Sequence, residues 1–237
     1  DIVINKPLVN EITLTPTNCN AGLKRLRKHG LTNELKDFLI SKHVDPEFAW
    51  KKFFVAYVPE GHTDEFMGVD EFNEPKRAKN SSIFTPTLIQ DNRGIVCIGG
   101  QARPIYGTKS YFTLYSYSAR NYLYGEHLLE TVKGKPLFVE EGQFDVIKTW
   151  QCNQAAVGLF GLFVSEPRAF KIARARPSHV RLFLDPDKYG KDATEAATSK
   201  LHDRGILTTV VEHGTDPKYC DELTFKKLVE PIHIGSI

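Results

Sequence analysis

The sequence predicts an α/β protein in two parts, and three observations support that fold class. After Gly134, short apolar runs alternate with helical patterns, which is typical of a parallel sheet with crossover helices. Before Gly134, helical patterns precede two β-rich runs joined by turn-forming residues, which indicates an α+β arrangement. The 237 residues, 41% of them hydrophobic, can bury a sizeable core. We therefore expect a lead segment over 1–30, an N-terminal α+β subdomain over 31–134, a parallel-sheet domain over 135–223 and a C-terminal tail over 224–237.

The elements of the first part follow from spacing and turn residues. We expect an irregular polar lead through Cys19 and Asn20, with the later run of Lys24, Arg25, Arg27 and Lys28 favouring a solvated helix face over a DNA-tracking one. A helix over 32–38 is predicted by apolar residues that share one face, and a short helix is expected over 46–54. Residues 82–100 predict a hairpin that turns at 91–94.

The second part is expected to hold four buried strands and three helices. The strands are short apolar runs over 136–140, 155–159, 179–184 and 206–211. The helices are predicted over 143–152, 166–176 and 191–204. Ser165 suits the N-cap of the second helix, and Gly205 suits the stop after the third. This pattern predicts a four-stranded parallel-type sheet with crossover helices.

Two acidic clusters follow predicted strands of this sheet. Glu141-Gly142 with Asp145 comes after the first strand, and Asp185-Pro186-Asp187 comes after the third. Open α/β sheets place ligand sites at the carboxyl ends of their strands. Crowded carboxylates repel one another unless a cation neutralises them, and Mg²⁺ or Mn²⁺ prefers oxygen ligands. Either cluster alone is more often an ordinary turn, but the two together predict a metal site.

A third acidic residue, Asp216, follows the last predicted strand and is a further candidate ligand. A polar Asp-Pro turn explains Asp216 equally well. The four cysteines show no zinc-ligand spacing and no disulfide framework, so we expect no zinc and a reducing, intracellular setting. No apolar run is long enough to span a bilayer, so no membrane partner is expected. Since the chain begins at Asp1 without an initiator Met, it is interpreted as a fragment of a longer protein.

The net charge of +2 does not by itself indicate a nucleic-acid binder, but the charge is unevenly distributed. The segment between residues 100 and 135 contains five basic residues and two acidic ones, so it is the candidate for phosphate contact. Arg103, Lys109 and Arg120 are the residues expected to contact a nucleotide or a nucleic-acid backbone. Solvated surface charge is the alternative for each.

The acidic spacing resembles a known family signature. Glu141-Gly142-x-x-Asp145 followed by Asp185-x-Asp187-x-x-Gly190 is similar to the Toprim signature of bacterial-type primases, topoisomerases and some nucleases. Segments of the first part resemble, in the same order, the polymerase core of bacterial and phage DnaG-type DNA primases. The matching segments lie at 38–44, 54–59, 83–86, 94–96, 98–100, 109–111 and 121–125. The resemblance covers about 31–223.

The resemblance implies a Toprim catalytic domain over 135–223 and a DNA-directed RNA polymerase of the primase type. Such an enzyme makes short RNA primers on single-stranded DNA from NTPs. It implies that Glu141, Asp185 and Asp187 are catalytic and hold two or more Mg²⁺ or Mn²⁺ ions, with Asp145 and Asp216 contributing. It further implies a replicative helicase as partner, a cytoplasmic location in a bacterial cell, and a tail over 224–237 that begins a truncated or minimal helical subdomain. A compact phage-type enzyme fits this length best.

Two departures and two alternatives accompany this interpretation. Gln101 stands where the family's F-G-G-R segment has arginine, and Lys218 stands where another acidic residue is common after Asp-Pro. The same carboxylates could serve a Toprim-family nuclease that cuts phosphodiesters. A non-catalytic module that docks nucleic acid or a helicase is the second alternative.

Overall fold

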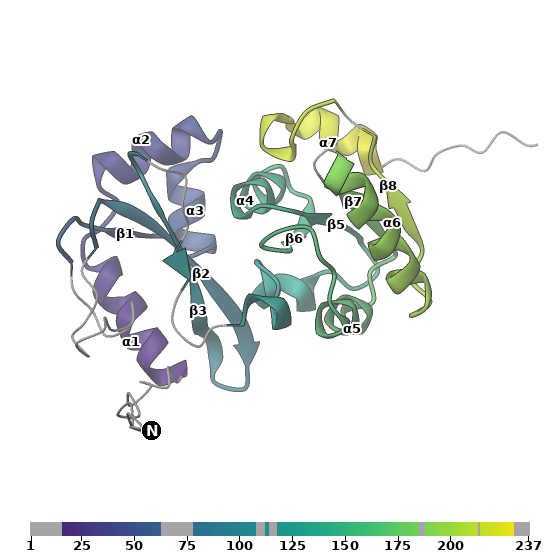
Figure 1. The fold of residues 1–237 in the computed structure, drawn as a ribbon, viewed down its shortest axis with the longest axis horizontal. Coiled ribbons are helices and arrows are strands. Elements are labelled where there is room, and N and C mark those ends of the chain that lie inside the picture. Colours follow the sequence, from purple (N-terminus) through teal and green to yellow (C-terminus); the bar gives the residue numbers. More distant parts are fainter. Residues whose placement is uncertain are drawn as a thin grey trace, which may run out of the picture.

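Two four-stranded sheets organise the chain. A computed structural model describes residues 16–62, 78–107, 112–113, 118–184, 188–212 and 214–229. One sheet is antiparallel with the strand order β1-β2-β3-β4, and the other is parallel with the order β6-β5-β7-β8 (Figure 1). The predicted α/β fold class and the four-stranded parallel sheet are therefore confirmed.

The antiparallel sheet is built around the predicted hairpin. Its strands are β1 (Ala56–Val58), β2 (Ser82–Asp91), β3 (Gly94–Pro104) and β4 (Phe112–Thr113). Asp91 pairs with Gly94 across the turn, and the Asp91 carboxylate accepts the Arg93 backbone N–H at 2.8 Å. An aspartate that caps its own turn in this way fixes the hairpin register.

Two predicted helices of the first part are confirmed, and both begin at a side-chain cap. They are α2 (Asn33–Ser41) and α3 (Pro46–Lys52). The Thr32 hydroxyl accepts the Leu35 N–H at 3.2 Å, and the Asp45 carboxylate accepts the Phe48 N–H at 2.6 Å. Each cap satisfies a backbone donor that the first helical turn leaves unpaired.

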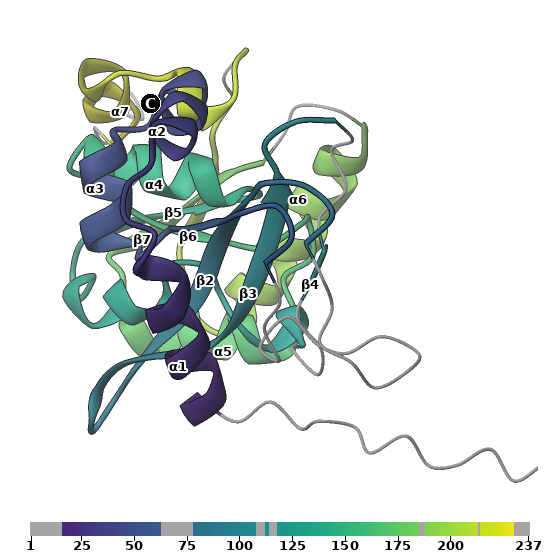
Figure 2. The same ribbon diagram turned by 90° about the vertical axis from the view of Figure 1, so that its left-hand side faces the viewer.

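The expected irregular lead is wrong for residues that form a further helix, α1 (Pro16–Arg27). Cys19, Leu23 and Leu26 are buried and pack with the antiparallel sheet, which α1 crosses (Figure 2). Their spacing of four and three residues is the helical period. Arg27 stacks 3.9 Å from the Trp50 ring and donates to the Trp50 carbonyl at 2.8 Å, so this member of the basic run is held by the fold.

The second part contains all of its predicted strands and helices. The parallel strands are β5 (Pro136–Glu140), β6 (Ala155–Gly158), β7 (His179–Phe183) and β8 (Thr208–Val210). The α-helices are α4 (Gln143–Gln151), α5 (Glu166–Ala175), α6 (Lys188–His202) and α7 (Glu222–Val229). Among the described residues, the 3₁₀ helices η2 (Ala119–Asn121) and η3 (Glu126–Thr131) precede β5, and η4 (Pro217–Tyr219) lies between β8 and α7.

Helices cover both faces of the parallel sheet, as expected for right-handed crossovers (Figure 1). On one face, Phe138 of β5 packs with Ile147 of α4 and lies 5.4 Å from Phe225 of α7, between ring centroids. On the other face, strand residues pack with Ile172 of α5 and Leu201 of α6. The helix α7 extends past the expected boundary at residue 223. Its residue Phe225 is fully buried, so α7 packs on the sheet of the second part.

The two parts share one hydrophobic core. The Phe38 ring of α2 lies 5.5 Å from the Phe144 ring of α4, and the Tyr124 ring of the first part lies 5.9 Å from the Phe160 ring of the second. This packing places β3 of the antiparallel sheet beside the start of α4. Within the described ranges, none of the helices combines the length and apolarity that a membrane span requires.

Candidate active site

The acidic clusters converge at the carboxyl ends of β5 and β7. These strands are parallel neighbours, and Glu140 at the end of β5 pairs with Phe183 at the end of β7. Glu141 therefore follows β5 at the edge where the chain leaves β7 for Asp185 and Asp187. Asp185 and Asp187 lie outside the described residues. The predicted neighbouring strand ends are confirmed, and the positions of the two aspartates stay a prediction.

Gly142 is required because the Asp145 side chain folds back against it. A Cβ atom at position 142 would lie 2.5 Å from Asp145 Oδ2, closer than real Cβ contacts. Gly142 is the N-cap of α4, and Asp145 lies in the first turn of that helix, where a negative charge is favoured. The E-G-x-x-D spacing thus places one carboxylate beneath the turn that carries Glu141.

Lys218 links the Asp145 and Asp216 carboxylates. The Lys218 backbone N–H donates to Asp145 Oδ1 at 3.2 Å, and its ammonium nitrogen lies 3.6 Å from the same oxygen. The same ammonium forms an ion pair with Asp216. Asp145 and Asp216, both predicted metal ligands, are thus brought together around a side-chain cation.

The pKa of Asp145 is raised above its ordinary value. Burial is the main cause, since Asp145 is only 8% exposed and desolvation disfavours the carboxylate. Lys218 opposes this shift through its charge and its backbone hydrogen bond, while the Asp216 carboxylate reinforces it. Lys218 therefore offsets part of the electrostatic cost of the Asp145 carboxylate.

Glu140 is a second buried acid at this edge, and the sequence reasoning did not assign it a role. It is fully buried, and its Oε1 accepts the Thr149 hydroxyl at 2.6 Å. Its Oε2 has no hydrogen-bond partner among the residues that the structure describes. Burial, followed by the charge of Asp145, holds the pKa of Glu140 well above its usual range. The sequence could have indicated that Glu140 is buried, because residues 138 and 140 of a strand lie on the same face of the sheet and Phe138 is a core residue.

An amide pair joins the antiparallel sheet to the acidic edge. Gln143 Nε2 donates to Gln101 Oε1 at 2.5 Å, and Gln143 is only 4% exposed. Gln101 is the residue that departs from the F-G-G-R arginine. Next to it, a Cβ atom at Gly100 would lie 2.5 Å from the Thr85 carbonyl, so β2 and β3 approach closely here. Gln101 therefore contacts the residue that directly follows the Glu141-Gly142 turn.

The three predicted phosphate-contacting residues lie in different places. Arg103 is in β3, with its guanidinium carbon 5.8 Å from the centre of the Phe38 ring. Arg120 is an exposed residue of η2. Lys109 lies outside the described residues. Their roles as nucleotide or backbone contacts stay predictions.

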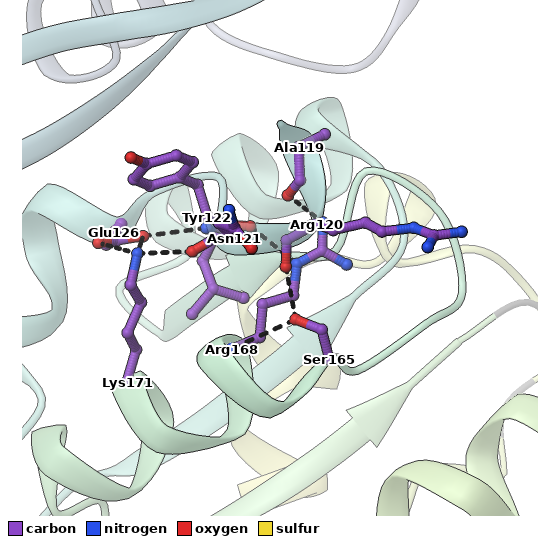
Figure 3. A network of polar contacts seen from close by, with 9 residues as sticks. Ala119, Arg120, Asn121, Tyr122, Glu126, Ser165, Arg168 and Lys171 are labelled. Atoms are coloured by element: carbon purple, nitrogen blue, oxygen red, sulfur yellow. Dashed lines mark hydrogen bonds and ion pairs between the residues drawn. The ribbon is translucent and has the colours of Figure 1, made fainter. Parts of the chain in front are cut away.

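A buried arginine in α5 holds the segment that carries Arg120. Arg168, only 3% exposed, donates to the carbonyl oxygens of Ala119 and Tyr122 at 2.6 and 2.8 Å (Figure 3). It also donates to the Phe163 carbonyl oxygen at 2.5 Å. The Ser165 hydroxyl caps α5 and donates to the Arg120 carbonyl at 2.5 Å. In Figure 3 the Arg120 side chain points away from the nearby ion pair of Glu126 and Lys171. Sequence reasoning missed Arg168 because its partners lie as many as 49 residues away.

The donor chemistry of this edge suits a hard divalent cation. Glu141 and Asp145 offer carboxylate oxygens, which Mg²⁺ and Mn²⁺ prefer to nitrogen or sulfur ligands. Within the described ranges, no three histidine, cysteine or acidic side chains form a metal-binding group. Asp185 and Asp187, which would complete such a group, are not among those residues.

Comparison with known proteins relates this edge to a known family of folds. A family model described as Toprim-like matches residues 138–222. That range begins in β5 and ends at the first residue of α7, so it includes Glu140, Glu141, Asp145, Asp185, Asp187 and Asp216. Among curated proteins, none matches the chain.

Solved primase structures share the fold of most of this chain. The primase of Aquifex aeolicus, solved with its zinc-binding and RNA polymerase domains, superposes with a TM-score of 0.73 at 19% identity, over 92% of this chain and 62% of that one. The E. coli primase catalytic core gives 0.73 at 18%, over 91% and 79%. A DnaG primase catalytic domain bound to ssDNA gives 0.70 at 19%, over 90% and 76%. The chain thus has the fold of primase catalytic cores and spans less than two thirds of the Aquifex chain.

Proposed function

We propose that this chain, which has a Toprim-like segment within the fold of primase catalytic cores, synthesises RNA primers on single-stranded DNA. The observation that carries the proposal is the pairing of parallel β5 and β7, with Glu140 opposite Phe183. It brings the carboxyl ends of both strands to one edge, where Glu141 follows one and Asp185 and Asp187 follow the other. This is the arrangement that nucleotidyl transfer through shared divalent cations requires.

Glu141, Asp185 and Asp187 are the proposed metal-holding and catalytic residues. Bound Mg²⁺ or Mn²⁺, in two or more copies, would activate the primer 3′-hydroxyl and neutralise charge on the phosphates. Asp145 and Asp216 remain candidate ligands, but Lys218 already pairs with both carboxylates. We assign them first the task of holding the Glu141-Gly142 turn.

The remaining proposed contacts position substrates. Arg103, Lys109 and Arg120 would bind the triphosphate of an NTP or the template backbone. The bound ssDNA of the similar DnaG catalytic domain supports a single-stranded template as partner. Placement by charged contacts, with little covalent chemistry by the protein, is how polymerases of this kind work. A replicative helicase is proposed as a further partner.

Primer synthesis tests the proposal. The protein is incubated with single-stranded template, labelled NTPs and Mg²⁺, and short RNA products are resolved by electrophoresis. We expect wild-type protein to make them and the Asp185→Ala, Asp187→Ala double variant to make none. The matched control is Asp192→Ala, Asp203→Ala, which removes two exposed acids of α6 and the turn after it. Primers from the first variant, or template shortening by the wild type, would overturn the proposal.

A further inference from the structure

A basic recess lies on the opposite edge of the parallel sheet from the carboxylates. It is a cavity of about 340 Å³ between the end of β2, the segment from η3 to Lys133, and the last turn of α5. Its polar lining is Gln90, Glu126, Glu130, Lys133, Lys171, Arg174 and Arg176. Lys133 comes three residues before β5 and Arg176 three before β7, and the Gly134 N–H donates to the Arg176 carbonyl at 2.9 Å. The recess therefore lies at the amino ends of these strands.

The recess carries uncompensated positive charge. Lys171 pairs with Glu126 at 2.7 Å, so these two charges cancel. Lys133, Arg174 and Arg176 are exposed, and none has a carboxylate partner within the part of the chain that the structure describes. Glu130 is the remaining acid in the lining. The dipole of α5 explains a cation at Arg174, but Lys133 comes from a different segment.

The helix α5 runs from near the acidic edge to this recess. The helix begins next to Ser165, which holds the Arg120 carbonyl, and its ten residues span about 15 Å. The Lys171–Glu126 pair and the Arg168 contacts fasten the 119–126 segment along that length (Figure 3). Exposed cations therefore lie at both ends of one rigid unit, Arg120 at one end and the recess at the other.

We propose that the recess binds backbone phosphates of a single-stranded nucleic acid that extends along α5 from the acidic edge. Two basic points separated by the length of a helix suit a chain of repeated phosphates, because one nucleotide is too short to reach both. A cavity of about 340 Å³ is the size of a small-ligand site, so it admits one strand's phosphate and sugar and excludes a double helix. The inference rests on the proposed function for its ligand class.

Salt-dependent binding tests the recess without any catalysis. Fluorescence anisotropy of a labelled oligodeoxythymidine is measured against NaCl concentration for wild type and for the triple variant Lys133→Gln, Arg174→Gln, Arg176→Asn. Asparagine is used at 176 because that residue has φ of +53°, which asparagine tolerates. The control variant Lys51→Gln, Lys226→Gln, Lys227→Gln removes three exposed cations elsewhere.

Loss of three phosphate contacts should reduce the slope of log K against log salt by about 2, at about 0.7 per phosphate on single strands. The control variant should keep the wild-type slope. Equal slopes for the triple and control variants would overturn the proposal, as would equal competition by free ATP or by blunt duplex. If wild-type protein makes no primers, the proposed function fails, but these binding curves still show whether the recess binds single-stranded nucleic acid.

Discussion

Removing the Lys218 ammonium should destabilise the protein in a pH-dependent way. In Lys218→Met the side chain keeps its length, but Asp145 loses the cation 3.6 Å away. Breaking a fully buried pair costs about 3–5 kcal/mol. The side chains of Lys218 and Asp145 retain 21% and 11% exposure, so we expect a smaller loss, about 2 kcal/mol, in the free energy of unfolding at neutral pH.

The sign of the pH dependence follows from Asp145. Its pKa is already raised by burial, and removing Lys218 raises it further. The folded variant therefore holds this proton more tightly than the unfolded chain, whose aspartate titrates near about 3.9. Because the wild-type carboxyl also has a raised pKa, both proteins should lose stability in parallel just above that pH. The variant should fall relative to wild type, by as much as about 1.4 kcal/mol per pH unit, between the folded-state pKa of Asp145 in the wild type and its higher value in the variant.

Urea unfolding of both proteins from about pH 4 to about pH 8 measures this difference. Lys218→Arg should restore most of the stability, because it replaces the cation. Lys226→Met is the matched control, since Lys226 pairs with Glu222 at 2.8 Å on the exposed face of α7, where solvent screens the pair and its loss should leave stability nearly unchanged. A pH-independent loss in Lys218→Met would refute the electrostatic explanation and leave only lost packing.

Two further buried groups give separate predictions. The Glu140→Gln side chain keeps an acceptor for the Thr149 hydroxyl but cannot ionise. Because the pKa of Glu140 is raised, wild-type stability should fall as pH rises above about 4.3. Urea unfolding should therefore show the variant becoming more stable relative to wild type over that pH range. A difference that stays constant with pH would show that folded Glu140 titrates like an unfolded glutamate, so that its pKa is not raised. Arg168→Met removes donors to three carbonyls and should lower the free energy of unfolding by about 3 kcal/mol, whereas exposed Arg174→Met should change it by less than about 0.5 kcal/mol. Similar losses of unfolding free energy in the two arginine variants would contradict a stabilising role for the three Arg168 hydrogen bonds.

The parallel sheet was predictable because its signals are local and periodic. Buried strands such as 136–140 read as apolar runs, and crossover topology then places their carboxyl ends at one edge. The α1 helix was predictable in the same way, since Cys19, Leu23 and Leu26 follow the helical period. The basic run from Lys24 was interpreted as a helix face, but the start of the helix was missed because polar residues separate the three apolar positions.

The contacts that complete the site could not be predicted from local sequence. Lys218 reaches Asp145 across 73 residues, and Gln101 reaches Gln143 across 42. Such contacts depend on how the two parts pack, through rings such as Phe38 and Phe144, and no periodicity encodes that packing. Sequence reasoning therefore identified the acidic residues but not the groups that tune them.

The two departures from the primase pattern act on opposite sides of the same acidic turn. At position 101 a glutamine replaces the expected arginine, and its amide contacts Gln143, two residues after Glu141. At position 218 a lysine replaces a common acid, and its ammonium lies against Asp145 and Asp216. Position 101 thus supplies a neutral amide in place of a cation, and position 218 supplies an ammonium in place of an acid. Because Lys218 pairs with the inner carboxylates, cation binding at this edge should depend chiefly on Glu141, Asp185 and Asp187.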